Sequence, residues 1–191
     1  MAYRLPVHYE DIKYNNAMLN TMLEVEIKSK CDNLDEVKKK IVDCGGTLLS
    51  FGIEDDSYFI HPSRDFAKTD EALRIRKVND AYYFTYKGPR LGGKSKTRYE
   101  KEMKITDADA LQEILLRLGF QLYGRVQKKR EVYLLSEVTV CCDDVSNLGT
   151  FVELEMISNN KDEAEKRLFA MAKQLGLSQF ITQSYLEMVK K

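Results

Sequence analysis

The sequence predicts an α+β domain whose antiparallel sheet curves or closes on itself. The first observation is a strand with charged residues at alternate positions, which occurs at 23–28, 99–105 and 152–156. The second is an amphipathic helical stretch ending in glycine, which follows each copy, at 34–45, 108–119 and 161–176. The third is a series of further alternating stretches bounded by turn residues. Such repeats predict roughly eight or nine strands with three or four helices.

Composition restricts the class of protein and its partners. The chain has 191 residues, of which 43% are hydrophobic and 31% charged, as in an ordinary globular domain. Thirty basic and thirty acidic side chains cancel, so no overall field attracts nucleic acid or an anionic membrane. The sequence shows neither a membrane-length apolar run nor the apolar core of a signal peptide. We therefore expect a cytoplasmic protein with no nucleic acid and no membrane as partner.

Residues 1–21 do not follow the repeat, and we expect them to form an N-terminal extension to a single domain at 22–191. The four cysteines and two histidines show no zinc-binding spacing. We therefore expect reduced thiols and no histidine-based catalysis.

In the first strand, Glu24, Glu26 and Lys28 share one face, because successive side chains of a strand point to opposite sides. The helix that follows has Asp32 or Asn33 as its N-cap. Its apolar stripe is predicted to consist of Leu34, Val37, Ile41 and Val42. If this stripe covers the apolar face of the strand, the charged face points the other way.

Between the first two copies we expect two strands, 47–51 and 57–60, around an acidic turn at 54–56. A hairpin with a turn at Asn79-Asp80 follows. Its polar faces carry three cations, Arg74, Arg76 and Lys87. The glycine-rich basic segment 88–96 could close over an anion, although a solvated loop is the more common outcome.

The second copy carries Glu100 and Glu102, and its helix has a predicted apolar stripe. That stripe consists of Leu111, Ile114, Leu115 and Leu118. Later strands are predicted at 121–135, 138–143 and 152–156, followed by helices at 161–175 and 183–189. The polar residues of these strands include Lys128, Arg130, Asp143, Glu153 and Glu155.

The polar strand faces form an acidic and a basic set. The acidic set is Glu24, Glu26, Glu100, Glu102, Asp143, Glu153 and Glu155. The basic set is Lys28, Arg74, Arg76, Lys87, Lys128 and Arg130. If the sheet closes, these charges line a lumen that must hold water, counter-ions or a ligand, because dry burial of so many ions is costly. The alternative is an open sheet whose charges pair across strands in water.

The two sets suit a metal–polyphosphate complex. Carboxylates without nearby histidine or thiolate favour Mg²⁺ or Mn²⁺, which commonly bind through carboxylates and substrate phosphate. Arginine and lysine side chains bind phosphate oxygens. The spacing of the residues does not choose between this chemistry and simple ion pairing.

The segment Glu24-Val25-Glu26-Ile27-Lys28 resembles the Glu-x-Glu-x-Lys signature of the CYTH superfamily, the triphosphate tunnel metalloenzymes. This superfamily joins class IV (CyaB-type) adenylate cyclases to thiamine and inorganic triphosphatases. Further matching segments follow in the family's order, at 73–76, 86–89, 100–102, 128–130, 143–149 and 151–155. The resemblance covers about residues 22–189.

The resemblance implies an eight-stranded antiparallel β-barrel with flanking helices and a triphosphate tunnel. By position, the whole basic set listed above would bind the triphosphate, and Glu24, Glu26 and Lys28 would be catalytic. The metal candidates would be Glu24, Glu26, Glu153 and Glu155, with Glu100, Glu102 and Asp143 as further ligands or orienting groups. A homodimer is also expected from the resemblance.

The segments 87–89 and 184–187 are more similar to the cyclase branch, and the chain has no tryptophan to stack on thiamine. The favoured function is therefore conversion of ATP to cyclic AMP and pyrophosphate. The alternatives are hydrolysis of inorganic triphosphate, thiamine triphosphate or a nucleoside triphosphate, and a non-catalytic polyphosphate- or nucleotide-binding module.

Overall fold

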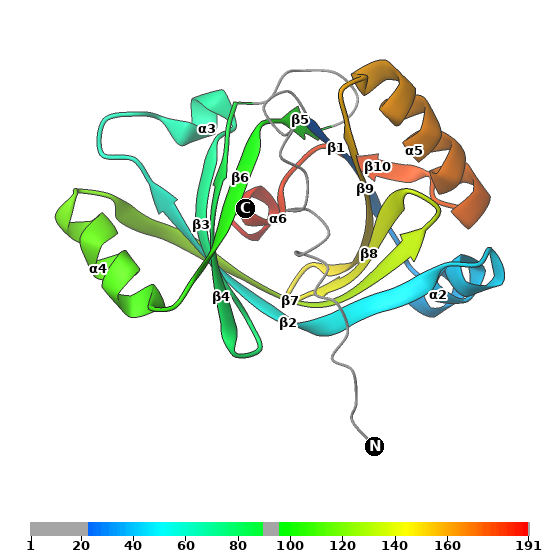
Figure 1. Cartoon of the computed structure of the whole chain (residues 1–191), viewed down its shortest axis with the longest axis horizontal. Coiled ribbons are helices and arrows are strands. Elements are labelled where there is room, and N and C mark those ends of the chain that lie inside the picture. Colours follow the sequence, from blue (N-terminus) through cyan, green and yellow to red (C-terminus); the bar gives the residue numbers. More distant parts are fainter. Residues whose placement is uncertain (1–22, 90–95, 191) are drawn as a thin grey trace.

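Residues 23–89 and 96–190 are described by a computed structural model, in which ten strands form one antiparallel sheet curled into a nearly closed barrel (Figure 1). The strands are β1 (Leu23–Lys30), β2 (Thr47–Ile60), β3 (Ala72–Val78), β4 (Ala81–Lys87), β5 (Lys96–Arg98), β6 (Glu100–Ile105), β7 (Gln121–Leu135), β8 (Val138–Val145), β9 (Gly149–Ser158) and β10 (Gln179–Ile181). The helices are α2 (Leu34–Asp43), α3 (Phe66–Thr69), α4 (Ala108–Arg117), α5 (Lys161–Leu175) and α6 (Tyr185–Val189). The predicted extension at 1–21 and most of the basic loop at 88–96 lie outside the described residues.

The sheet closes through β5 and β6, which are separated only by Tyr99. The strand order is β10-β1-β9-β8-β7-β2-β3-β4-β6, and β5 returns to pair with β1. Glu24 of β1 is opposite Arg98 of β5, while Lys87 of β4 is opposite Glu100 of β6. With β5 and β6 counted as one interrupted strand, and the short β10 left aside, eight strands complete the ring, as the family resemblance implied.

The main core lies outside the ring, between the sheet and the helices α2 and α5 (Figure 1). Val25 and Ile27 of β1 are buried there against Val37 and Ile41 of α2 and Leu168 of α5. Since the apolar face of β1 is covered by helices, Glu24, Glu26 and Lys28 point into the ring. This is the orientation that alternation alone could not decide.

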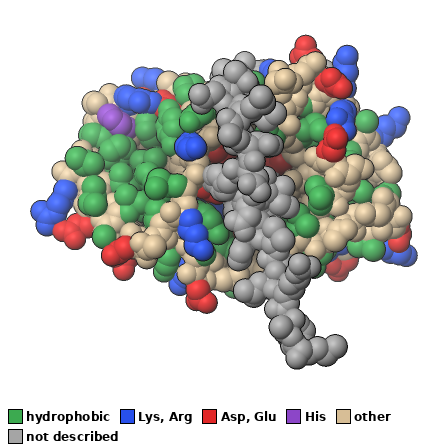
Figure 2. Space-filling view, in the orientation of Figure 1, with side chains coloured by type: hydrophobic (Ala, Val, Ile, Leu, Met, Phe, Trp, Pro, Cys, Tyr) green, Lys and Arg blue, Asp and Glu red, His purple; other side chains and the backbone are tan. Residues whose placement is uncertain are grey.

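Two helix stripes are narrower than predicted. Val42 of α2 is 58% exposed, and Ile114 and Leu118 at the α4 helix are 54% and 64% exposed. Only Leu115 of α4 is fully buried, in a second core with Phe59 of β2. Neighbouring helical positions are about 100° apart around the axis, so a residue next to a buried one, as Val42 is to Ile41 and Ile114 to Leu115, can already face water. Leu118 is the C-cap that follows the last residue of α4. Figure 2 shows hydrophobic side chains gathered on the α4 side of the molecule.

The predicted acidic turn at 54–56 is wrong, because β2 runs without interruption from Thr47 to Ile60. Asp55 is opposite Lys77 of β3 and Gln127 of β7, so the ladder continues on both sides of the expected turn. Glu54 and Asp56 are buried inside the ring beside its cations. Their charge, which suggested a turn from sequence, is satisfied by tertiary partners.

The predicted terminal helix is present as α6, and in Figure 1 it appears in the middle of the ring of strands. Ser184 is its N-cap and forms a capping box with Glu187. Within the described ranges, no helix is long and apolar enough to cross a membrane.

Candidate tunnel site

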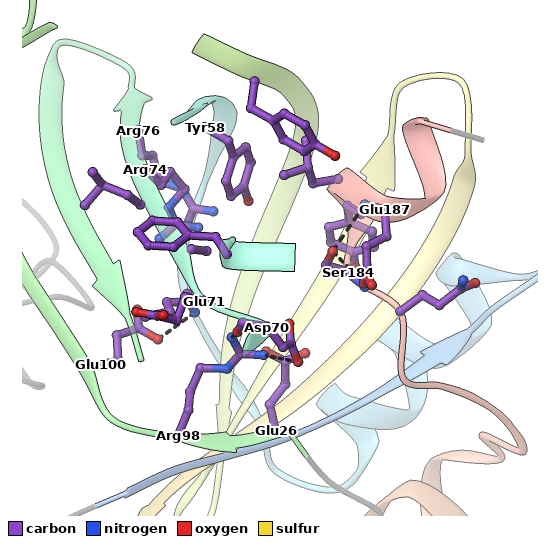
Figure 3. A pocket seen from close by; sticks show the side chains of 18 of the residues that line it. Glu26, Tyr58, Asp70, Glu71, Arg74, Arg76, Arg98, Glu100, Ser184 and Glu187 are labelled. Atoms are coloured by element: carbon purple, nitrogen blue, oxygen red, sulfur yellow. Dashed lines mark hydrogen bonds and ion pairs between the residues drawn. The ribbon is translucent and has the colours of Figure 1, made fainter. Parts of the chain in front are cut away.

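A cavity of about 540 Å³ occupies the interior of the barrel (Figure 3). Twelve of the thirteen predicted site residues line it. They are Glu24, Glu26, Lys28, Arg74, Arg76, Lys87, Glu100, Glu102, Lys128, Arg130, Glu153 and Glu155. The thirteenth, Asp143, is fully buried behind Arg130. Strand pairing and barrel closure together bring into one cavity residues that are up to 131 positions apart in sequence, from Glu24 on β1 to Glu155 on its partner strand β9.

The guanidinium groups of β3 are held by carboxylates of neighbouring strands. Arg76 donates to both oxygens of Asp56, from Nε at 2.6 Å and from Nη2 at 2.8 Å. Arg74 donates to Glu102 and to the hydroxyl of Thr85, both at 3.2 Å. Burial opposes charge on Arg76, but Asp56 and Glu54 outweigh burial and raise the pKa of this side chain well above its usual value. Both cations therefore stay charged and in fixed positions.

A second pair of cations comes from β7. Arg130 donates from Nε to Asp143 at 2.6 Å and also contacts Glu153. Lys128 lies 3.3 Å from Glu54 and 3.6 Å from Asp143. Burial would raise the pKa of Glu54, but Arg76, Lys128 and Arg130 together lower it to about 2. Glu54 is thus an anion in the centre of the cation cluster.

The remaining two lysines lie near the glutamates of the repeated strands. The ammonium group of Lys28 is 3.0 Å from Glu153, its cross-strand neighbour on β9. That of Lys87 is 2.6 Å from Glu100 and 3.6 Å from Glu24. Burial alone would lower the pKa of Lys87, yet these two carboxylates raise it above its ordinary value.

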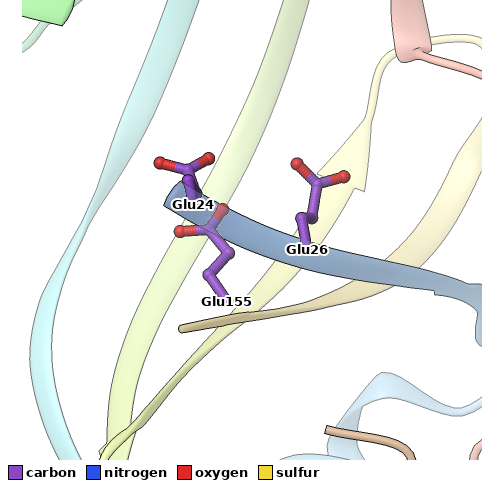
Figure 4. A group of neighbouring side chains, drawn as sticks. All are labelled: Glu24, Glu26 and Glu155. Carbon is purple, nitrogen blue, oxygen red and sulfur yellow. The ribbon is translucent and has the colours of Figure 1, made fainter. Parts of the chain in front are cut away.

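Three of the seven predicted metal candidates form one carboxylate cluster. Oxygens of Glu24, Glu26 and Glu155 all lie within 4.8 Å of one another (Figure 4). Glu26 and Glu155 are direct cross-strand neighbours on β1 and β9. Oxygens on opposite sides of one Mg²⁺ are about 4.2 Å apart, since each lies about 2.1 Å from the ion. Small side-chain movements would therefore let this cluster hold Mg²⁺ or Mn²⁺.

The other four metal candidates are placed differently. Glu153 and Asp143 contact Arg130, Glu100 contacts Lys87, and Glu102 contacts Arg74. Among the described residues, none of these four belongs to a cluster of three converging carboxylates, and we therefore expect them to orient the cations.

Several residues of the site were not predicted from sequence. Glu54 and Asp56 were assigned to a turn, and the alternation of 54 and 56 with their neighbours was the missed signal. Arg98 lines the cavity and donates to the carboxylate of Asp70 at 3.1 Å (Figure 3). Tyr185 of α6 also lines it. The resemblance of segment 184–187 to the cyclase branch marked this segment, but residue spacing does not place it inside the barrel.

Comparison with known proteins gives the family. The CYTH domain model matches residues 22–185, which is most of the chain. This chain belongs to the CYTH family. The resemblance of its Glu-x-Glu-x-Lys segment is thereby confirmed, together with the barrel fold.

Relatives of this CYTH protein carry related names. A Methanocaldococcus jannaschii protein named "putative adenylate cyclase" is 40% identical, over 87% of this chain and 98% of the relative. Adenylate cyclase CyaB of Aeromonas hydrophila is 28% identical, over 85% of this chain and 86% of the relative.

Solved structures share the fold of this CYTH protein. A Pyrococcus horikoshii protein superimposes with a TM-score of 0.80 at 41% identity, over 87% of this chain and 98% of that protein. A Hippeastrum protein described with a dominant triphosphatase activity has a TM-score of 0.64 over 88% of this chain and 95% of its own, but only 15% identity. That likeness shows a common fold and nothing finer.

Proposed function

We propose that this CYTH protein is a metal-dependent adenylate cyclase that converts ATP to cyclic AMP and pyrophosphate. The observation that carries the proposal is the convergence of six cations, five buried and Lys87 partly buried, on one cavity that also holds a three-carboxylate cluster. The names of the two curated relatives point in the same direction.

The cations match a polyphosphate in charge and geometry. Arg74, Arg76 and Arg130 offer planar forks for phosphate oxygens, and the three lysines offer point charges. In the structure each of these cations is paired with a carboxylate, which keeps it charged and in a fixed position. A bound triphosphate would therefore contact cations that are already in place. Such preorganisation is what makes charge stabilisation effective during reaction.

The cyclisation forms a bond from the ribose 3′-oxygen to the α-phosphorus and breaks the bond to the leaving pyrophosphate, while the 3′-hydroxyl loses its proton. Mg²⁺ or Mn²⁺ held by Glu24, Glu26 and Glu155 would activate the hydroxyl and neutralise phosphate charge. The arginines and lysines would hold the triphosphate and stabilise the negative charge that builds on the pyrophosphate. Enclosure in the barrel would keep water from competing with the ribose hydroxyl.

Triphosphate hydrolysis is the second candidate. The observation in its favour is that every charged contact described above suits the phosphate chain, so an inorganic or nucleoside triphosphate would be held alike. Attack by water on the terminal phosphorus, in place of the ribose hydroxyl on the α-phosphorus, would then release orthophosphate.

The test is an assay of purified protein with Mg²⁺ or Mn²⁺ and, separately, ATP, thiamine triphosphate and inorganic triphosphate. We expect cyclic AMP and pyrophosphate in equal amounts from ATP. Orthophosphate without cyclic AMP would replace the cyclase by the triphosphatase. No product from any substrate would favour the non-catalytic binding module.

Glu26→Gln provides the first variant, because it removes one negative charge from the carboxylate cluster with little change of shape. We expect turnover to fall by more than about 100-fold, beyond the losses usual for residues that only support a metal ligand. The control is Glu113→Gln on the exposed face of α4, which should keep wild-type turnover. An unchanged rate in Glu26→Gln would exclude this residue from the reaction.

A further inference from the structure

The C-terminal segment enters the barrel and contacts its cations from one end. The carbonyl of Gln183 accepts a hydrogen bond from the ammonium group of Lys28 at 3.2 Å. Tyr185, two residues later, is buried, and its hydroxyl donates to Asp143 at 2.8 Å. Burial and the negative charges of Asp143 and Glu153 raise the pKa of this phenol well above its usual value, so the hydroxyl keeps its proton.

The ring of Tyr185 lies beside two of the predicted phosphate-binding lysines. The ammonium nitrogen of Lys28 is 3.9 Å from the ring centroid, and that of Lys128 is 5.1 Å from it. Both distances are within the range of cation–π attraction. These lysines come from different strands, β1 and β7, and Asp143 joins the same side chain to Arg130. One residue of α6 thus contacts two cations directly and a third through a carboxylate.

On β7, β8 and β9 the charged side chains that point into the ring end at the level of Tyr185. On β7 the side chains of Arg130, Lys128 and Val126 follow one another on the face that points into the ring. Val126 is buried in an apolar cluster with Tyr185. On the same face of β9, Glu153 is followed by Phe151, whose ring centroid is 5.1 Å from that of Tyr185.

The strand β8 and the helix α6 complete the apolar end of the barrel. On the inward face of β8, Asp143 is followed by Val145, which is also buried in the cluster. Leu186 and Met188 of α6 pack against it. An anion that reached past the tyrosine ring would therefore leave the six cations of the basic set behind and meet this apolar cluster, which is unfavourable.

We propose that Tyr185 is the end-stop of the tunnel: a positioning and specificity-determining residue that holds Lys28 and Lys128 toward the cavity and limits the length of the phosphate chain. The ligand class is a linear polyphosphate, whether inorganic or part of a nucleotide. The inference rests on the proposed function only in requiring that the tunnel binds such a chain.

Two substitutions separate the ring from the hydroxyl. Tyr185→Phe keeps the ring between the lysines and loses the hydrogen bond to Asp143. Tyr185→Leu loses both, while its apolar side chain can still pack on Val126 and Phe151. The control is Tyr133→Leu, since Tyr133 is also a buried tyrosine whose hydroxyl donates to a carboxylate, that of Glu131 at 2.6 Å, but it lies in the core outside the ring.

The experiment measures binding of inorganic triphosphate and tetraphosphate by calorimetry, with EDTA present so that no turnover occurs. Wild type and Tyr133→Leu should bind triphosphate in clear preference to tetraphosphate. In Tyr185→Leu we expect that preference to fall at least tenfold, because the chain can extend past position 185. Tyr185→Phe should keep the wild-type preference with weaker binding of both anions.

An unchanged preference in folded Tyr185→Leu would overturn the end-stop, and so would an equal loss of preference in Tyr133→Leu. If the proposed cyclase function is wrong, the measurements differ from those that would overturn the end-stop. In that case the protein would make no cyclic AMP and still show the length preference and its loss in Tyr185→Leu.

Discussion

At the residue scale, Glu54 and Asp56 explain how the barrel tolerates so many buried cations. Arg76 is held by both carboxylates, and Lys128 by Glu54. Removing one partner from a buried ion pair typically costs about 3–5 kcal/mol, because the other charge remains desolvated. These two acidic residues are therefore part of the fold as well as of the site.

The lowered pKa of Glu54 predicts that the folded protein loses stability in acid. Its pKa is lowered to about 2 in the folded protein, from 4.5 in the unfolded chain, so the stabilisation is complete above pH 4.5 and is lost as the pH falls toward 2. The total is about 3 kcal/mol. We expect the free energy of unfolding of the wild type to exceed that of Glu54→Gln at pH 7, and this difference to shrink between pH 4.5 and pH 3.

Urea unfolding at pH 7, 5, 4 and 3 measures this difference. Glu113→Gln, at an exposed position of α4, should follow the wild type at every pH. A constant difference between wild type and Glu54→Gln across this range would contradict the assignment.

At the scale of the element, the helices α2, α4 and α5 stabilise the barrel from outside, and none of their residues lines the tunnel. Leu168 of α5 is fully buried against the outer face of the sheet. The helix begins where the side chain of Asn160 accepts from the backbone N–H of Glu163, and it ends at Gly176 in the left-handed region. Both signals are visible in the sequence, as are the equivalent caps at Asn33 and Asp107.

Leu168→Ala should therefore affect stability and leave the site intact. We expect the free energy of unfolding to fall by about 2–5 kcal/mol, the usual cost of truncating a buried leucine. The affinity of the remaining folded protein for triphosphate should stay at the wild-type value. Lys166→Ala on the exposed face of α5 is the control, with a change within about 0.5 kcal/mol. A loss of affinity in Leu168→Ala at a temperature where it is folded would show that α5 shapes the tunnel.

At the scale of the whole molecule, cations from β1, β3, β4 and β7 meet only when the sheet closes. A ligand that bridges them should therefore stabilise the entire barrel. At 100 times its dissociation constant, a ligand adds about 2.7 kcal/mol to the free energy of unfolding. For a chain of this size we expect inorganic triphosphate to raise Tm by roughly 5–10 °C.

Arg76→Ala should abolish most of this rise in Tm, and should weaken triphosphate binding much more than monophosphate binding, since a monophosphate needs fewer cations. Arg117→Ala, an exposed arginine of α4, should behave as the wild type. Equal losses of affinity for the two anions would contradict binding of the whole triphosphate chain by these cations.

The sequence by itself determined the alternation of charged and apolar faces, the positions of α2, α4, α5 and α6, and the thirteen residues of the charged sets. Alternation in a strand and capping of a helix are local effects, so neighbouring residues suffice to reveal them. The family signature added the closed barrel and its inward-facing charges.

The tertiary structure decided what depends on distant partners. Glu54 and Asp56 continue a strand because Arg76, Lys128 and Arg130 neutralise them. Glu24, Glu26 and Glu155 gather because β1 pairs with the distant strand β9. Tyr185 reaches the lysines because α6 is packed into the barrel's apolar end. Ion pairing and burial act through space, and the spacing of residues along the chain does not encode them.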